Sequence, residues 1–167
     1  MTVFVEARTL NAPGEPRSRY QIDCGGARLR VHTLRVATVL NIEGEIDAAN
    51  AEAVAAEIRR FSRLKAPLIL DLSRLEFLGS AGLHALLVLD EEHRRDRLHY
   101  NVIGGRALNR LISVTPADGL PLADSVPDAL GRAQDAIRAR RRVVRGAARQ
   151  HEPQRDRWRA GCPRSDR

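Results

Sequence analysis

The sequence is short of the residue types on which several protein classes depend, and each shortage excludes one of them. Only two cysteines occur in 167 residues, Cys24 and Cys162, and they lie near opposite ends, which indicates reduced thiols rather than a disulfide framework. The longest apolar runs, such as residues 85–89, fall far short of the roughly 18 to 20 residues of a membrane-spanning helix. The first residues show no basic segment followed by an apolar one, so no secretory signal is predicted and a cytoplasmic location is expected.

Metal-binding patterns are missing, and the basic residues are unevenly placed. The five histidines have neither the HExxH spacing nor a paired spacing with cysteine, so the sequence predicts no metal site and no cofactor.

Lysine occurs once, at Lys65, and arginine supplies the rest of the 28 basic residues. Twelve arginines but only 4 acidic residues follow residue 130, which leaves residues 1–130 nearly neutral although the whole chain has a net charge of +7. The positive charge therefore belongs to the end of the chain.

The sequence does contain short apolar runs that alternate with helical periods. Val54, Ile58 and Phe61 form the clearest helical set, and residues 68–72, "LILDL", are typical of a central strand covered on both faces. The expected strands are 29–33, 37–43, 68–72, 98–104 and an edge strand within 120–125, and the expected helices are 50–64, 81–95, 107–114 and 126–140. This alternation predicts an α/β fold with a mixed β-sheet of four to five strands flanked by helices.

The chain length suits a single domain with a tail at each end. Residues 1–27 mix charges with prolines and glycines without a sustained period, which predicts a loosely ordered arm, and the domain is expected at 28–138. Residues 139–167 are rich in arginine and poor in apolar residues, which predicts a disordered tail. Nucleic acid is expected to bind this tail weakly at most, with Trp158 stacking on bases, because most charge runs are solvated and bind nothing in particular.

The stretch "LEFLGSAGLHAL", residues 75–86, places Ser80 where an apolar run stops and a helical period begins. A hydrolase nucleophile elbow needs glycine two residues before and after the serine, and Leu78 occupies the first position. The Walker pattern of a phosphate-binding loop is also absent from the sequence. No catalytic residue is therefore predicted, and the protein is not expected to be an enzyme. The structural interpretation makes Ser80 an N-cap whose oxygen accepts a backbone N–H, while Gly79 and Gly82 ease a tight turn.

Four segments in fixed order carry a family resemblance: "VATVLNIEGEIDAANAEAVAAEI", "APLILDLSRLEFLGSAGLHALLVL", "LHYNVIG" and "ALNRLISVTPADGLPLADSVPDAL". Their combined features are Gly44 to Asp47 after a strand, Asp71 near the end of the central strand, and Ser80-x-Gly82 at the start of a helix. Together they resemble the STAS domain of bacterial anti-sigma factor antagonists over residues 29–130. The resemblance implies a single STAS-like domain that binds a partner protein instead of transforming a substrate.

The resemblance also implies how binding is controlled. In the family, an anti-sigma factor that is a serine kinase binds the unphosphorylated antagonist and so frees a sigma factor. Phosphorylation of the residue matching Ser80 breaks that complex. Ser80 is therefore the phosphorylation candidate, and Asp47, Gly79, Ser80, Ala81 and Gly82 are the partner-binding candidates. Family members commonly carry Asp and a second Ser or Thr where this sequence has Gly79 and Ala81.

Other interpretations remain open for two of these residues and for the chain. An acidic residue after a strand, such as Asp47, is typical of a turn or cap former. Asp71 is expected to organise the serine loop, because no second carboxylate is paired with it for acid–base work. For the whole chain, the alternative is a STAS-type subunit of another assembly, in stress signalling or lipid transport, without a phospho-switch. No membrane partner is expected.

Overall fold

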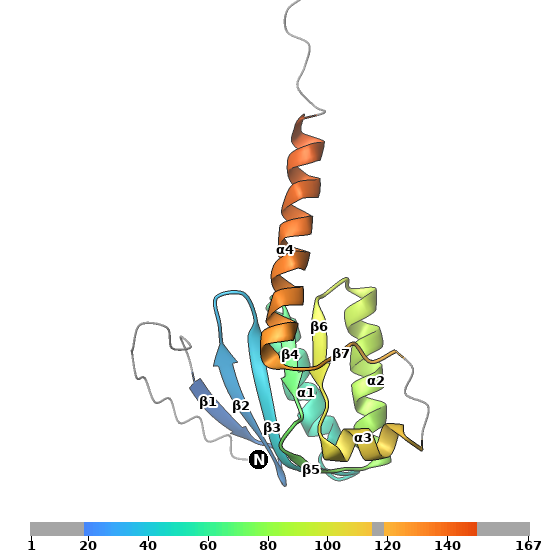
Figure 1. Ribbon diagram of the computed structural model, residues 1–167. Helices are drawn as coiled ribbons and strands as arrows, with labels where there is room; N and C mark the ends of the chain where they lie inside the picture. Colours follow the sequence, from blue (N-terminus) through green and yellow to red (C-terminus); the bar gives the residue numbers. More distant parts are fainter. Residues whose placement is uncertain (1–18, 115–118, 150–167) are drawn as a thin grey trace, which may run out of the picture. The chain divides into compact units, whose positions relative to one another are not determined.

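The computed structural model describes residues 19–114 and 119–149, which form seven strands and four helices (Figure 1). In chain order the elements are β1 (Arg19–Asp23), β2 (Ala27–Thr33), β3 (Thr38–Ile46), α1 (Ala51–Ser62), β4 (Leu68–Asp71), β5 (Leu75–Leu78), α2 (Ser80–Arg95), β6 (Tyr100–Ile103), α3 (Arg106–Ile112), β7 (Leu122–Ala123) and α4 (Val126–Arg149). The chain divides into two compact units, Met1–Gln134 and Asp135–Arg167. None of the described helices is both long and apolar enough to cross a membrane.

The strands form one mixed sheet. Its order is β1-β2-β3-β4-β6-β7, and β5 pairs with β3 off this path. Neighbours among β1, β2 and β3 are antiparallel, whereas β4 and β5 on β3, β6 on β4 and β7 on β6 are parallel. Short turns suffice between antiparallel strands, but parallel neighbours need longer crossovers, which explains why the helices follow β3. The α/β class and the mixed sheet are confirmed, with more strands than the four to five expected.

The additional strands come from segments in which the sequence pattern is weak. β1 lies within residues 1–27, which were expected to form a loose arm, yet it pairs with β2 along its whole length and its Ile22 is buried. β5 has only four residues, too few to show a period. Residues 1–18 of the expected arm and 150–167 of the expected tail lie outside the described residues, so the disorder expected there stays a prediction.

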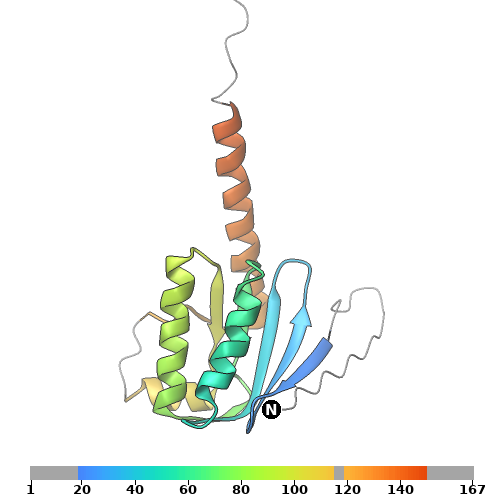
Figure 2. The ribbon, with the colours of Figure 1, turned by 180° about the vertical axis from the view of Figure 1, so that it is seen from behind.

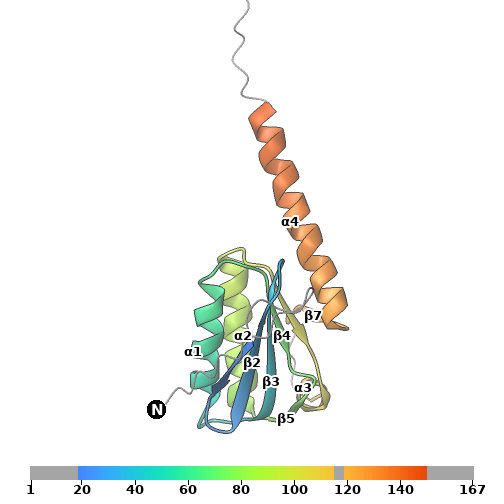
Figure 3. The same cartoon turned by 90° about the vertical axis from the view of Figure 1, so that its left-hand side faces the viewer.

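Each face of the sheet buries its own apolar cluster. Helices α1 and α2 lie side by side over one face (Figures 2 and 3), and the first turns of α4 pack against the other, where Ala129 joins Val39 and Ile69. Consecutive residues of β4 alternate between the clusters, since Leu68 and Leu70 belong to the first and Ile69 to the second. This strand is apolar throughout because both of its faces are covered. Burial of each such side chain contributes about 1.5–3 kcal/mol to the free energy of folding, relative to leaving it exposed.

The predicted helices are present in the predicted order, with shifts at their ends. Helix α1 buries Val54, Ile58 and Phe61 as the spacing indicates. Helix α4 starts at Val126 and carries Pro127 in its first turn, where the missing N–H has no helical partner to lose. It continues to Arg149 instead of ending near residue 140, so part of the segment expected to be a disordered tail is helical. Its alanines and arginines are strong helix formers, which the prediction from charge alone overlooked.

Candidate functional site

Ser80 lies where β5 gives way to α2, beside the end of β3. Strand β5 pairs in parallel with the last residues of β3, with Leu78 opposite Ile46. The N–H of Gly79 then donates to the carbonyl oxygen of Ile46 at 2.8 Å. The two chain segments that leave these strands, 47–50 and 79–80, are therefore neighbours, and the structure brings Asp47 and Gly79 together. A side chain at position 79 would lie 3.6 Å from the Cα atom of Asp47.

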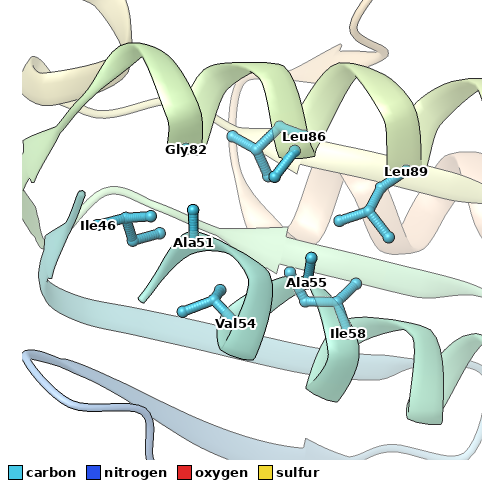
Figure 4. Close-up of a pocket in the computed structure, with 9 residues that line it drawn as sticks. Ile46, Ala51, Val54, Ala55, Ile58, Gly82, Leu86 and Leu89 are labelled. Carbon is cyan, nitrogen blue, oxygen red and sulfur yellow. The ribbon is translucent and has the colours of Figure 1, made fainter. Parts of the chain in front are cut away.

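Close packing under Gly82 fixes the start of α2. A Cβ atom added at Gly82 would lie 2.6 Å from Cδ1 of Leu78 and 2.7 Å from Cγ2 of Ile46, well inside van der Waals contact. Figure 4 shows Ile46 beneath Gly82, with Ala51 beside them and Leu86 further along α2 facing α1. Only glycine permits this approach without displacement of its neighbours. The helix start is held against the core, while Ser80 on the other side is exposed.

The expectation that Ser80 caps α2 is wrong. Gly79 is the N-cap, with an extended backbone at φ −81° and ψ 169°, and Ser80 is already the first helical residue. The first helical hydrogen bond runs from the N–H of Leu83 to the carbonyl of Gly79, at 3.0 Å, and within the described chain no side chain caps this helix. The hydroxyl of Ser80 is therefore not engaged in a cap. The neighbouring candidate Ala81 is partly buried and contributes no polar group.

Asn50 holds the segment around Asp47 in place. Its side-chain N–H₂ donates to the carbonyls of Gly25 and Glu45, both at 2.8 Å, and its side-chain oxygen accepts the N–H of Asp47 at 3.0 Å. Asp47 in turn accepts the N–H of Ala49 at 2.8 Å, so its carboxylate forms a local turn. Asn50 is the N-cap residue of α1, but its side chain does not cap this helix. Instead it joins β3, the turn before β2 and the segment leading into α1.

Asp71 is the last residue of β4, and strand β5 separates it in the chain from Ser80. Its carboxylate accepts a hydrogen bond from the side chain of Asn41 at 2.7 Å and another from the N–H of Ser73 at 3.0 Å. These bonds hold the turn that leads from β4 into β5. Gly105 approaches the same turn so closely that an added Cβ would lie 2.5 Å from the carbonyl oxygen of Leu72. The start of α3 therefore packs directly on this turn.

Phe77 is an exposed aromatic residue that the sequence reasoning did not single out. It lies opposite Glu45 in the pairing of β5 with β3, and its side chain is 49% exposed. Its ring edge would contact a Cβ at Gly79 at 3.4 Å, so it is adjacent to the start of α2. A phenylalanine in an apolar run is typical of a buried core residue, and only the pairing of this short strand places Phe77 at the surface. Aromatic residues, phenylalanine included, are enriched in protein interfaces relative to the rest of the surface.

The surface that contains Phe77, Asp47 and Ser80 is acidic, and we call it the junction face. Residues 45–52 and 76–84, which supply it, include four acidic residues and no arginine or lysine. Three of these, Glu45, Asp47 and Glu76, are exposed and lie next to Phe77 or Gly79 in the chain or in the pairing. The fourth, Glu52, pairs with Arg59 at 2.9 Å.

Two kinds of reactive group can be placed among the described residues, namely potential metal ligands and a thiol. In residues 19–114 and 119–149, no three His, Cys, Asp or Glu residues are arranged to hold a metal ion. Cys24 is buried, and burial raises the pKa of its thiol from 9.0 to about 11, which keeps the thiol protonated at neutral pH and weakens it as a nucleophile.

Known proteins share this architecture. The STAS domain family model matches residues 28–104. Osmosensory protein A of Mycobacterium tuberculosis is 38% identical over 128 residues, which cover 74% of this chain and 81% of that protein. An anti-sigma factor antagonist from Mycobacterium paratuberculosis has 32% identity and a TM-score of 0.57, over 65% of this chain and 94% of the other. The antagonist SpoIIAA in its unphosphorylated form shares the fold at 17% identity, with a TM-score of 0.51 over 64% of this chain and 96% of the other.

The chain therefore belongs to the STAS domain family, and the resemblance expected from the sequence is confirmed. Its relatives of known structure include anti-sigma factor antagonists.

Proposed function

We propose that the protein is an anti-sigma factor antagonist that acts in the cytoplasm as a binding module and not as an enzyme. It binds an anti-sigma factor through the junction face and so frees a sigma factor. The observation that carries this proposal is the exposed Ser80 beside the exposed Phe77, at the joined ends of β3 and β5. The 32% identity to a solved anti-sigma factor antagonist supports it.

Phosphorylation of Ser80 is the proposed switch. The hydroxyl is exposed and is not used as a helix cap, so a kinase reaches it without unfolding the helix. A phosphate adds about −1.5 to −2 charge. In an interface that buries Phe77, this charge would lose its hydration beside the carboxylates of Glu45 and Asp47, which is costly. Phosphorylation would therefore release the partner.

A binding measurement tests the partner and the switch together. The purified protein is titrated with the anti-sigma factor kinases of its host, one at a time, without ATP and by calorimetry. The proposal expects one of them to bind the native protein and the Ser80→Ala variant alike, but to bind Ser80→Asp at least about tenfold more weakly. Failure of every anti-sigma factor to bind the native protein would remove the proposed function.

The residue before Ser80 offers a direct test of the phosphorylation step. The backbone at Gly79 is extended, and a side chain there would meet its neighbours at 3.4 Å or more, which is ordinary contact. Aspartate, the common family residue, therefore fits. Incubation with the bound kinase and ATP, followed by mass spectrometry, should label Ser80, faster in Gly79→Asp, and should label nothing in Ser80→Ala. Binding without any label would leave an antagonist that has no switch.

The second candidate is a STAS-type subunit of another assembly that binds constitutively. Gly79 and Ala81 favour it, because they remove the carboxylate and the second hydroxyl that flank the phosphorylated residue in the family. A relative with a different name, Osmosensory protein A, covers most of this chain. Under this candidate Ser80→Asp would bind its partner as tightly as the native protein does.

A further inference from the structure

The second unit of the chain begins with a strongly basic helical segment. Residues 135–149 of α4 contain one acidic residue, Asp135, followed by six arginines with no acidic residue among them: Arg138, Arg140, Arg141, Arg142, Arg145 and Arg149. The side chain of Arg138 is 69% exposed, and Arg140 to Arg142 are exposed as well. We call residues 135–149 the arginine helix.

Three of its described arginines, Arg138, Arg141 and Arg142, are weakly neutralised by the described residues. Arg138 pairs with Asp135 at 3.6 Å, but both side chains are mostly exposed, and such a pair contributes little. Within the part of the chain that the structure describes, Arg141 and Arg142 form no ion pair. In the first unit, by contrast, Arg59 bonds to both Glu52 and Glu92 at distances near 3 Å. Arg138, Arg141 and Arg142 can therefore attract an external anion.

The spacing of the arginines suits an extended anion. Arg138, Arg142, Arg145 and Arg149 follow one another at intervals of four, three and four residues, which is the spacing of one helix face, and Arg141 lies three residues after Arg138 and four before Arg145. At a rise of about 1.5 Å per residue, the stretch 138–149 covers roughly 18 Å. Duplex DNA presents one negative charge per about 1.7 Å of its axis, and its major groove admits a helix. A single phosphate or carboxylate would use only part of this face.

The apolar residues of the segment argue against a membrane surface as the partner. Interfacial helices carry Trp, Phe or Leu on their apolar side, to be buried among the lipids. In the arginine helix the apolar residues are Ile137, Val143, Val144 and alanines. Their small area leaves electrostatic attraction to phosphate as the main source of affinity.

We propose that the arginine helix binds the phosphate backbone of duplex nucleic acid without reading its sequence. This inference goes beyond the proposed antagonist function and does not depend on it. From the sequence alone, all of these arginines except Arg138 belong to the disordered, solvated tail expected at residues 139–167, which would pay the entropy of ordering upon binding. Their place on a helix lowers that cost because the backbone that carries them is already ordered.

The test uses the full-length protein and a fluorescently labelled duplex DNA of about 25 base pairs and arbitrary sequence. Fluorescence anisotropy gives the affinity between about 50 and 200 mM NaCl. With four or five phosphates neutralised, the slope of log K against log salt is expected near −4, which corresponds to a loss of about two orders of magnitude over this range. Duplexes of unrelated sequence should bind equally.

Two variants of equal net charge separate the helix from the basic composition of the chain. One replaces Arg138, Arg141, Arg142, Arg145 and Arg149 by Gln, which keeps the helix propensity. The other replaces five arginines beyond the helix by Gln: Arg155, Arg157, Arg159, Arg164 and Arg167. The first should lose about tenfold or more in affinity and several units of slope, while the second keeps most of both.

Three outcomes would overturn the proposal. Equal losses of DNA affinity in the two variants would mean that the binding depends on the total number of arginines. No loss of affinity in the first variant would mean that DNA binds outside the arginine helix. Binding to phosphatidylserine vesicles but not to DNA would make the partner a membrane surface. Circular dichroism of both variants verifies that the helix content is retained.

Discussion

At the scale of single residues, Gly82 determines how closely α2 approaches the end of β3. Gly82→Ala should lower the free energy of unfolding by about 1–3 kcal/mol, because the added methyl group meets Ile46 and Leu78 below 3 Å. Urea unfolding followed by circular dichroism measures the change. Gly131→Ala is the matched control, since nothing lies within 4 Å of a Cβ there, and alanine in this helix should add up to about 1 kcal/mol. Equal effects of the two substitutions would contradict the packing described here.

A second residue-scale prediction concerns Cys24. Burial, followed by the nearby charges of Glu57 and Asp23, raises the pKa of its thiol from 9.0 to about 11. The unfolded chain releases this proton first, so the stability that Cys24 contributes is complete below about pH 9 and declines as the pH rises to about 11. The free energy of unfolding of the native protein, relative to Cys24→Ala, should fall over this range. A difference that stays constant from pH 8 to 11 would be the contrary result.

Single residues were also where the sequence was least informative. The motif around Ser80 could be located, because an apolar run and a helical period meet there. The sequence could not show that Gly79 is the N-cap, because serine and glycine both suit that position and one residue of shift decides between them. The exposure of Phe77 and the hydrogen bonds of Asn50 depend on partners in distant segments, for which a single sequence holds no signal.

At the scale of elements, Asn50 joins the segments beside the site. Asn50→Ala leaves the carbonyls of Gly25 and Glu45 without this donor in a buried place, and should cost about 1–3 kcal/mol in unfolding free energy. Thermal or urea unfolding tests it, with Asn109→Ala on the exposed side of α3 as a control that should change little. If both variants are equally stable, the side-chain hydrogen bonds of Asn50 do not contribute to the stability of the fold.

Phe77 belongs to the same scale, because the short strand β5 presents it. Under the proposed function, Phe77→Ala should weaken binding to the proposed anti-sigma factor partner by about tenfold or more, which is the loss expected for a central contact. Leu122→Ala removes an apolar side chain of similar exposure, 41%, from β7 and should leave the affinity unchanged. Calorimetric titration of both variants gives the comparison. A larger loss in Leu122→Ala would move the interface to the other edge of the sheet.

Elements whose own sequence carries a helical period or an apolar run could be predicted, and two strands that depend on their partners could not. Helices α1, α2 and α4 follow from periodicity, and the apolar residues of β2, β3, β4 and β6 indicate strands, because these side chains are buried. Strand β5 exists because β3 continues past β4 and offers a free edge to pair with. That opportunity is a property of the assembled sheet. The same holds for β1, whose pairing with β2 orders a segment of mixed composition.

At the scale of the whole molecule, the two units should differ in how much they contribute to stability. Removal of residues 135–167 should leave the melting temperature of the first unit nearly unchanged, because both apolar clusters and the buried Ala133 lie before residue 135. Removal of residues 126–167 uncovers Val39, Ile69 and Ile103 and should lower the melting temperature by roughly 10 °C or more, at about 4 °C per kcal/mol lost. Calorimetry of both truncated proteins measures the two melting temperatures. Equal values would contradict a stabilising role for the apolar cluster between α4 and the sheet.

Strand β3 pairs with β4 through residues 38–41 and with β5 through residues 44–46. Ser80 and Asp47, distant in the chain, therefore become neighbours only after the sheet is complete. A kinase or partner that reads both would ignore a nascent or heat-damaged copy, and a synthetic peptide of residues 75–86 would be a poor substitute for the protein. If the proposed function holds, recognition at this place would also select for the native fold, because an unfolded copy would not present the two segments together.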